Sequence, residues 1–253
     1  MIIFQRKIPL YRKEIFERIS FKRPIKIFLL TFVMFQSSVN FADTAEVYQW
    51  KAFPGKTQDL LISMNKAAAI HRSEGAQVSM NAHNIGSTQL VDYILRWDNP
   101  KDYAKGKDVQ ANSEAWVEFW AEANANPAGE MVASFAANNL DPTRKASDFN
   151  GSYVYSVSVW EVEAGKDLAL IERFMESKPI IEDTGARVEV YAANWGAPGE
   201  YHYVLVYDSW EALESSYAKL NAPGSDFMKL NQRRAIEETV AVQTSFFTGS
   251  TIN

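Results

Sequence analysis

Two short stretches of the chain carry the side chains best suited to chemistry. His83 and Asn84 lie in the first, and Asn194 and Trp195 lie at the matching place in the second, 110 positions further along. A histidine can bind a ligand or move a proton, and an asparagine amide can donate a hydrogen bond to an oxygen of a substrate. These four residues are therefore our first candidates for a ligand site.

Each candidate also has a structural interpretation. Asparagine tolerates tight turns, so Asn84 and Asn194 could simply end their strands before the glycine that follows each of them by two positions. His83 and Trp195 differ from the residues that match them in the other stretch. Such a difference is expected of residues in a ligand site, and it is equally expected from random sequence drift. His83 could also belong to a polar strand face, because polar residues occupy the alternate positions before it: Gln77, Ser79 and Asn81.

Four aromatic residues form a second set of candidates. They lie on strands expected in both halves of the chain: Tyr93, Trp97, Tyr203 and Tyr207. Grouped around a cavity, their rings would suit an apolar or aromatic small molecule. Packed in a core, the same rings would only stabilise the fold, and the sequence leaves both interpretations open.

The sequence argues against a metal centre. It contains no cysteine, and its three histidines, His71, His83 and His202, include no short-spaced pair. It also has no P-loop, dinucleotide fingerprint or nucleophile-elbow motif. We therefore expect no metal and no cofactor. A haem held by one histidine, His83 or His71, is the alternative.

The candidate residues sit in a duplicated sequence. Residues 74–86 match residues 184–196 at six positions, and 15 identities occur at an offset of 110 over positions 47–98. Later the offset becomes 111, with Phe135 opposite Phe246. A repeat of this length is a whole domain copied once, because solenoid units are only about 20–50 residues long.

Each copy predicts the same order of elements, β-α-β-β-α-β. Alternating apolar and polar residues predict strands, and spacing of three or four residues predicts helices after the first and third strands. We expect Asp98 to cap the second helix and Pro179 to kink or split the third. The expected strands are 47–53, 76–84, 89–97 and 130–136 in the first copy, and 153–162, 186–194, 201–207 and 239–248 in the second.

This α+β order is that of the ferredoxin-like fold, whose sheet has helices on one face and needs cover on the other. Two copies would cover each other. The sequence resembles the dimeric α/β-barrel superfamily, which includes antibiotic-biosynthesis-monooxygenase-like and NIPSNAP-like proteins. The resemblance rests on the element order, on residues 207–212 (Tyr-Asp-Ser-Trp-Glu-Ala) leading into a helix, and on Phe246-Phe247 in the last strand.

The resemblance implies two tandem ferredoxin-like βαββαβ repeats packed sheet to sheet as an intramolecular dimeric α/β barrel. The first repeat would span residues 45–137, a polar linker 138–152, and the second repeat 153–250. Because each copy covers the other, the chain would be a monomeric pseudo-dimer. Some monooxygenase-like members are thought to use asparagine, histidine or tryptophan on substrate oxygens, but no motif here maps those residues one by one.

The N-terminal segment, residues 1–42, is typical of a signal peptide. Eight basic residues precede a short apolar run from Ile27 to Phe35, which is too short to span a bilayer, and we expect cleavage after Ala42. A retained membrane anchor or an amphipathic surface helix is the alternative. Without this segment 18 basic and 29 acidic residues remain, a net charge of −11. Such a chain does not suit nucleic acid or anionic lipid, so we expect a periplasmic or secreted protein without stable membrane association.

Three classes of function fit these observations. The first is a small-molecule enzyme of monooxygenase or isomerase type that needs no cofactor and works in a pocket between sheet and helices. The second is a non-catalytic periplasmic protein that binds an apolar or aromatic ligand, and the third is a structural or interaction module. We favour the first through the resemblance alone, because one fold hosts many activities.

Overall fold

The structure is a computed structural model that describes residues 43–87 and 89–252. The predicted signal segment, residues 1–42, lies outside the described residues. Among the described helices, none combines the length and the apolar character needed to cross a membrane.

Each copy folds into four strands in the predicted order. The first contains β1 (Thr44–Ala52), α1 (Thr57–Ser73), β2 (Gln77–Ile85), β3 (Leu90–Trp97), α2 (Pro100–Ala111), α3 (Glu114–Ala125) and β4 (Gly129–Asn139). A short 3₁₀ helix, η1 (Ala146–Phe149), follows in the linker. The second contains β5 (Val154–Val162), α4 (Asp167–Glu182), β6 (Arg187–Trp195), β7 (Glu200–Tyr207), α5 (Trp210–Leu220), α6 (Asp226–Arg234) and β8 (Ala241–Thr251).

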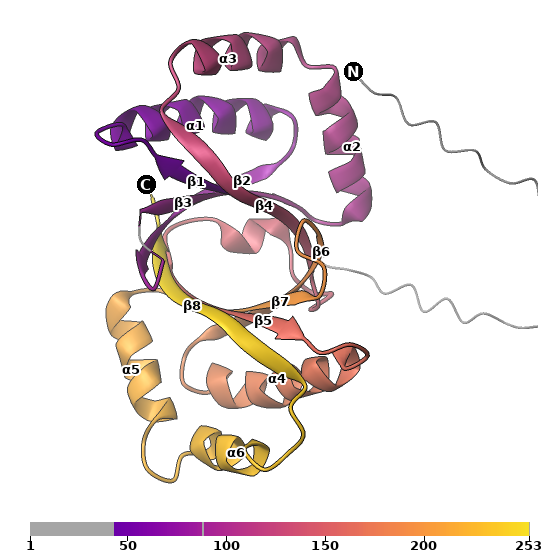
Figure 1. The fold of residues 1–253 in the computed structure, drawn as a ribbon, viewed down its shortest axis with the longest axis vertical. Helices are drawn as coiled ribbons and strands as arrows, with labels where there is room; N and C mark the ends of the chain where they lie inside the picture. Colours follow the sequence, from indigo (N-terminus) through magenta and orange to yellow (C-terminus); the bar gives the residue numbers. More distant parts are fainter. Residues whose placement is uncertain (1–42, 88, 253) are drawn as a thin grey trace, which may run out of the picture. The chain divides into compact units, whose positions relative to one another are not determined.

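The eight strands form one closed antiparallel barrel in the order β1-β3-β2-β8-β5-β7-β6-β4. Strands of different copies pair at two places, β2 with β8 and β4 with β6. Figure 1 shows the helices of the first copy against its own strands on one side of the barrel and those of the second copy on the other. This α+β barrel confirms the predicted fold class.

Strand periodicity gives every strand two different faces. On β3, Tyr93, Leu95 and Trp97 belong to the core beneath the helices of the first copy, while Asp92 and Arg96 line the barrel interior. Side chains alternate along a strand, so neighbouring residues face opposite sides of the sheet. The barrel wall therefore separates an interior space from two helix-covered cores.

The duplicated glycines close the barrel. Gly86 and Gly196 have positive φ angles of 93° and 89°. A Cβ at Gly86 would overlap the carbonyl oxygen of Phe246, and one at Gly196 would overlap that of Ser134. Glycine is required where the backbone of one copy passes this close to the other.

Three details differ from the sequence expectations. Pro179 does not split its helix, because it lies in the last turn of α4, where only one backbone hydrogen bond is lost. The N-cap of α2 is Asn99 and not Asp98: the Asn99 side chain accepts hydrogen bonds from the backbone of Lys101 and Asp102. Each second helix is divided in two, after Asn112 in the first copy and around Gly224 in the second.

The linker packs against the barrel instead of lying free. Phe149 is only 2% exposed, and it sits 4.0 Å from the guanidinium of Arg96 and 4.8 Å from that of Arg187. The backbone N–H of Ala146 donates to the carboxylate of Asp98 at 3.0 Å. These contacts fix the linker at one end of the barrel interior.

Candidate functional site

A large cavity lies in the first copy, between α1, α3 and the helix-covered face of the sheet. We call it the first-repeat pocket, and its volume is about 830 Å³. Six aromatic side chains line it: Tyr48, Trp50, Tyr93, Trp116, Phe119 and Trp120. Ligand sites in proteins are concave, largely apolar and of this size.

His71 is the histidine of this pocket. Its Nδ1 atom lies 2.8 Å from the hydroxyl of Tyr93, and its ring lies 4.3 Å from that of Trp116. Burial lowers the pKa of His71 to about 4, an effect that the nearby carboxylate of Glu74 opposes only in part. The imidazole is therefore neutral at pH 7, the form that binds a metal or accepts a proton.

A buried polar cluster adjoins the pocket through two of the residues that line it, Tyr48 and Lys107. The buried carboxylate of Glu46 accepts hydrogen bonds from Tyr48 and Tyr103 at 2.9 Å and from Lys107 at 3.1 Å. Burial, reinforced by Glu46, raises the pKa of Tyr48 well above its usual value, so its hydroxyl stays protonated. Gln110 also lines the pocket, and its buried side-chain amide nitrogen has no partner among the described residues.

The second copy has replaced this chemistry with packing. Ile181 stands at the position of His71, and Ser177 stands at that of Ala67. The hydroxyl of Tyr203, which corresponds to Tyr93, therefore meets Ser177 at 3.1 Å instead of an imidazole. A cavity of about 600 Å³ remains there, but its lining contains no histidine.

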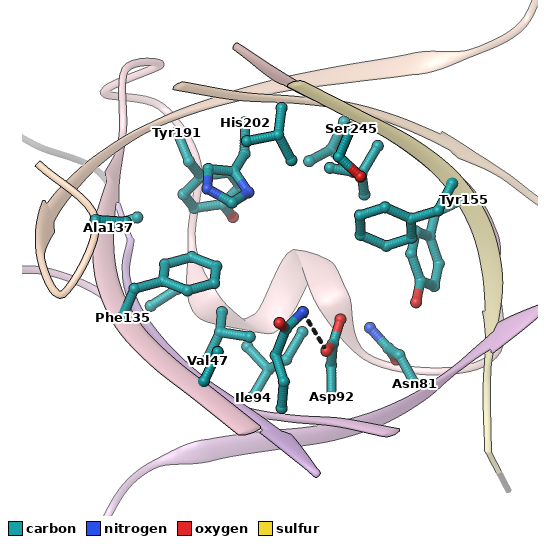
Figure 2. Close-up of a pocket in the computed structure, with 18 of the residues that line it drawn as sticks. Val47, Asn81, Asp92, Ile94, Phe135, Ala137, Tyr155, Tyr191, His202 and Ser245 are labelled. Carbon is teal, nitrogen blue, oxygen red and sulfur yellow. Dashed lines mark hydrogen bonds between the residues drawn. The ribbon is translucent and has the colours of Figure 1, made fainter. Parts of the chain in front are cut away.

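The barrel interior holds a separate space, which we call the barrel cavity, with a volume of about 400 Å³. Figure 2 shows Asn81, Asp92, Tyr155, His202 and Ser245 arranged around it, from strands of both copies.

His83 lies in the wall of the barrel cavity. Its Nε2 atom is 2.8 Å from Asp92, whose other oxygen accepts a hydrogen bond from Gln49 at 3.0 Å. The ring of His83 stacks on Phe247 with a centroid distance of 4.3 Å. His83 therefore lies on a polar face of the sheet, and that face lines a cavity.

The structure does not bring the other predicted site residues together. Tyr93 and Trp97 lie in the core of the first copy, whereas Tyr203 and Tyr207 lie in that of the second, across the barrel. The remaining three candidates are exposed near strand ends: Asn84, Asn194 and Trp195. The predicted shared aromatic cavity is absent among the described residues because equivalent strands turn equivalent faces toward different helices.

The sequence led us to name His71 only as an alternative haem ligand, although one feature of the sequence distinguished it. It differs from its counterpart in the other copy, Ile181, which is the same argument that favoured His83. It also follows the helical spacing of Met64, Ala67 and Ala68, and this spacing alone indicated a core position. The contribution of Trp116 from α3 could not be read from the sequence, because it depends on how α3 packs on α1.

Comparisons with known proteins identify the fold. No family model and no curated protein matches the chain. Solved structures do match: a proposed monooxygenase from Fusobacterium nucleatum at 10% identity and a TM-score of 0.56, covering 84% of this chain and 94% of that one. An anthrone oxidase-like protein matches at 12% identity and a TM-score of 0.52, and the match covers 85% of this chain and 93% of that one. A proposed chlorite dismutase matches at 11% identity and a TM-score of 0.54, and the match covers 84% of this chain and 95% of that one. The protein has the dimeric α/β-barrel fold. At such identities the likeness concerns the fold.

The expectation that this barrel protein has no cofactor is contradicted by the same comparisons. They include the proposed chlorite dismutase, at a TM-score of 0.54. The physical reason for the error is that a missing histidine pair argues against zinc-type sites only, whereas one histidine can hold a haem iron.

The residues of the first-repeat pocket fit a haem, and those of the barrel cavity do not. His71 offers a neutral imidazole whose Nδ1 is oriented by Tyr93, within aromatic walls and sufficient volume. His83 also has a nitrogen without a partner, Nδ1, but it lines a cavity of half that volume, which is too small for a haem. Among the described residues, no group of three His, Asp or Glu side chains is placed to hold a bare metal ion.

Proposed function

We propose that the protein binds a flat, largely apolar small molecule in the first-repeat pocket and oxidises it with dioxygen in a monooxygenase-type reaction, in which one oxygen atom enters the ligand and the other leaves as water with two hydrogens of the ligand. The observation that carries this proposal is a large aromatic pocket with one neutral imidazole, that of His71, in its wall. The proposal is supported by the names of two proteins that share the fold, the proposed monooxygenase and the anthrone oxidase-like protein.

The pocket residues would divide the work. The rings of Trp116 and Trp50 would stack on or enclose a flat ligand and exclude water. Tyr93 holds the imidazole of His71 in place, and the free nitrogen of that ring would accept a proton from the ligand or bind a haem iron. Haem, when bound, would supply redox chemistry at its iron. The side-chain amide of Gln110 would donate a hydrogen bond to a ligand oxygen.

A non-catalytic binding role is the second candidate. It is favoured by the protonated state of the tyrosines near His71, since burial raises the pKa of Tyr48 and of Tyr93 well above the usual value. Because the tyrosines stay protonated, the imidazole of His71 is the side chain left to accept a proton among the described residues of the pocket.

Titrations with hemin and with anthrone test the proposal. We expect the full chain to bind both, with a Soret band for hemin, and to accelerate the aerobic loss of anthrone. His71→Ile, which installs the residue of the second copy, should remove the Soret shift and lower anthrone turnover at least about tenfold. The matched control is Ser177→Ala, which removes the partner of Tyr203 in the other copy and should change neither result.

The two readouts separate the candidates. Binding of anthrone without accelerated loss would replace the enzyme by the binding protein. Binding of neither probe, or equal effects of His71→Ile and Ser177→Ala, would overturn the assignment of the first-repeat pocket.

Export is also part of the proposal, and the residues that bear on it are 1–42. The basic stretch, the apolar run and the small residue Ala42 support a cleaved signal. N-terminal sequencing of the protein recovered from its cell compartment should begin at Asp43. A cytoplasmic protein that retains residue 1 would contradict it.

A further inference from the structure

The barrel cavity is a second concave space, independent of the first-repeat pocket. The two cavities lie on opposite faces of the same strands, so they share none of the residues that line them. Phe149 of the linker lines the cavity at one end, whereas partly or fully exposed residues line it at the other, among them Ser134, Glu200 and Thr244. Part of the wall between the ends is apolar: Val47, Ile94, Phe135, Val157, Val204 and Phe247.

The charged groups of this cavity are not balanced. Asp92 and Glu200 contribute two carboxylates. Arg96 is the one arginine or lysine that lines the described cavity, and it already faces the buried carboxylate of Asp43 at 3.4 Å. The partners of Asp92 are His83 and Gln49, so no permanent cation compensates either carboxylate.

One of the histidines that line the barrel cavity offers a hydrogen-bond acceptor beside the two carboxylates. A carboxylate can only accept, so the nitrogen of His83 that faces Asp92 carries the proton. In the neutral ring the other nitrogen, Nδ1, then presents a lone pair, and this buried atom has no partner among the described residues. His202 faces Glu200 at 3.5 Å and stacks on Phe135 with a centroid distance of 4.6 Å. Figure 2 shows His202 on the opposite side of the cavity from Asp92.

We propose that the barrel cavity binds a small primary amine with an apolar body. An ammonium group is positively charged and donates hydrogen bonds, which suits a cavity lined by two carboxylates and an imidazole lone pair. The apolar body would lie against Val157, Ile94 and Val204. A cavity of about 400 Å³ limits the ligand to one or two small rings or a short alkyl chain.

Calorimetric titration of the full chain with three isosteric probes tests this inference: 2-phenylethylamine, 2-phenylethanol and 3-phenylpropanoate. We expect the amine to bind at least about tenfold more tightly than the alcohol, and the carboxylate not to bind, because charge-assisted hydrogen bonds select the cation. Asp92→Asn and Glu200→Gln should each weaken the amine about tenfold, and Val157→Phe should remove its binding by filling the apolar section.

His71→Ile is the matched control, because His71 lies in the other cavity. It should leave amine binding unchanged while it removes the Soret shift of hemin and lowers anthrone turnover, so the failure of one proposal is distinguishable from that of the other. Glu200 is partly exposed, so Glu200→Gln decides the outcome should Asp92→Asn unfold in circular dichroism. Equal affinity for all three probes, no amine binding at millimolar concentration, or amine binding unaffected by Glu200→Gln would overturn the proposal.

Discussion

At the scale of single residues, the chemistry of this protein depends on what surrounds each histidine. His71 lies among aromatic rings with a tyrosine hydroxyl at Nδ1, and His83 lies against a carboxylate and a phenylalanine ring. The same residue type is therefore suited to apolar ligand chemistry in one cavity and to polar recognition in the other.

His71 should make the stability of the protein depend on pH. Its pKa is lowered from 6.5 to about 4 in the folded protein, so the unfolded chain binds the proton more tightly. Its contribution is complete above pH 6.5 and is lost as the pH falls toward 4. Between pH 7 and pH 4 we expect the free energy of unfolding to fall by about 2 kcal/mol more in the wild type than in His71→Ile. This value allows for the partial exposure of the ring.

Urea unfolding of both proteins at pH 7 and pH 4 measures this difference, because the carboxylates common to both cancel. A difference of zero, or one of opposite sign, would mean that the His71 ring is protonated in the folded state.

The close approach at Gly86 should make this residue far more sensitive than Gly75. Both have positive φ, but a Cβ at Gly75 meets open space, whereas one at Gly86 overlaps the backbone of Phe246. Gly75→Ala should cost about 1–2 kcal/mol through backbone strain alone. The loss of unfolding free energy caused by Gly86→Ala should be at least about twice that caused by Gly75→Ala. Equal losses would show that β8 moves aside without cost.

At the scale of elements, helices and strands do different work. The helices of each copy cover one face of their own strands, and the pairings β2–β8 and β4–β6 join the copies. The linker adds a third contribution, because η1 places Phe149 at the end of the barrel between Arg96 and Arg187.

Phe149→Ala should therefore destabilise the protein by about 3–5 kcal/mol, as expected for a buried phenylalanine. Phe246→Ala is the control, because Phe246 is 44% exposed and should cost much less. Thermal or urea unfolding compares the two. A loss at Phe149 no larger than that at Phe246 would mean that the linker only rests on the barrel.

At the scale of the whole molecule, duplication has produced a barrel from one chain and freed the two copies to diverge. The closed strand order leaves no unpaired sheet edge among the eight described strands. A second chain is therefore not needed to complete the fold, and the prediction of a monomeric pseudo-dimer stands as a proposal. Divergence of the copies kept a histidine in one helix-covered pocket and not in the other.

Sedimentation should give the mass of one chain for the complete protein. A fragment that spans only the first repeat, residues 45–137, should instead associate or aggregate, because its sheet loses its cover and the partners of β2 and β4. A stable homodimer of the complete protein, or a soluble monomeric fragment, would contradict this account of the duplication.

The sequence by itself determined the architecture. The 110-residue offset, the alternation from Gln77 to His83 and the helical spacing around Met64 each depend on local periodicity, which survives without knowledge of contacts. The helix ends were harder to predict from the sequence. Asn99 and Asp98 are both good N-cap residues, and only the backbone geometry decides which of them caps α2.

Only the tertiary structure decided where the cavities lie. It placed Trp116 of α3 beside His71 of α1, and Tyr203 and Tyr93 on opposite sides of the barrel. The physical reason is that a cavity is the volume left unfilled by side chains from segments far apart in the chain. That volume depends on how α1, α3 and the sheet pack together, and on no single stretch of sequence.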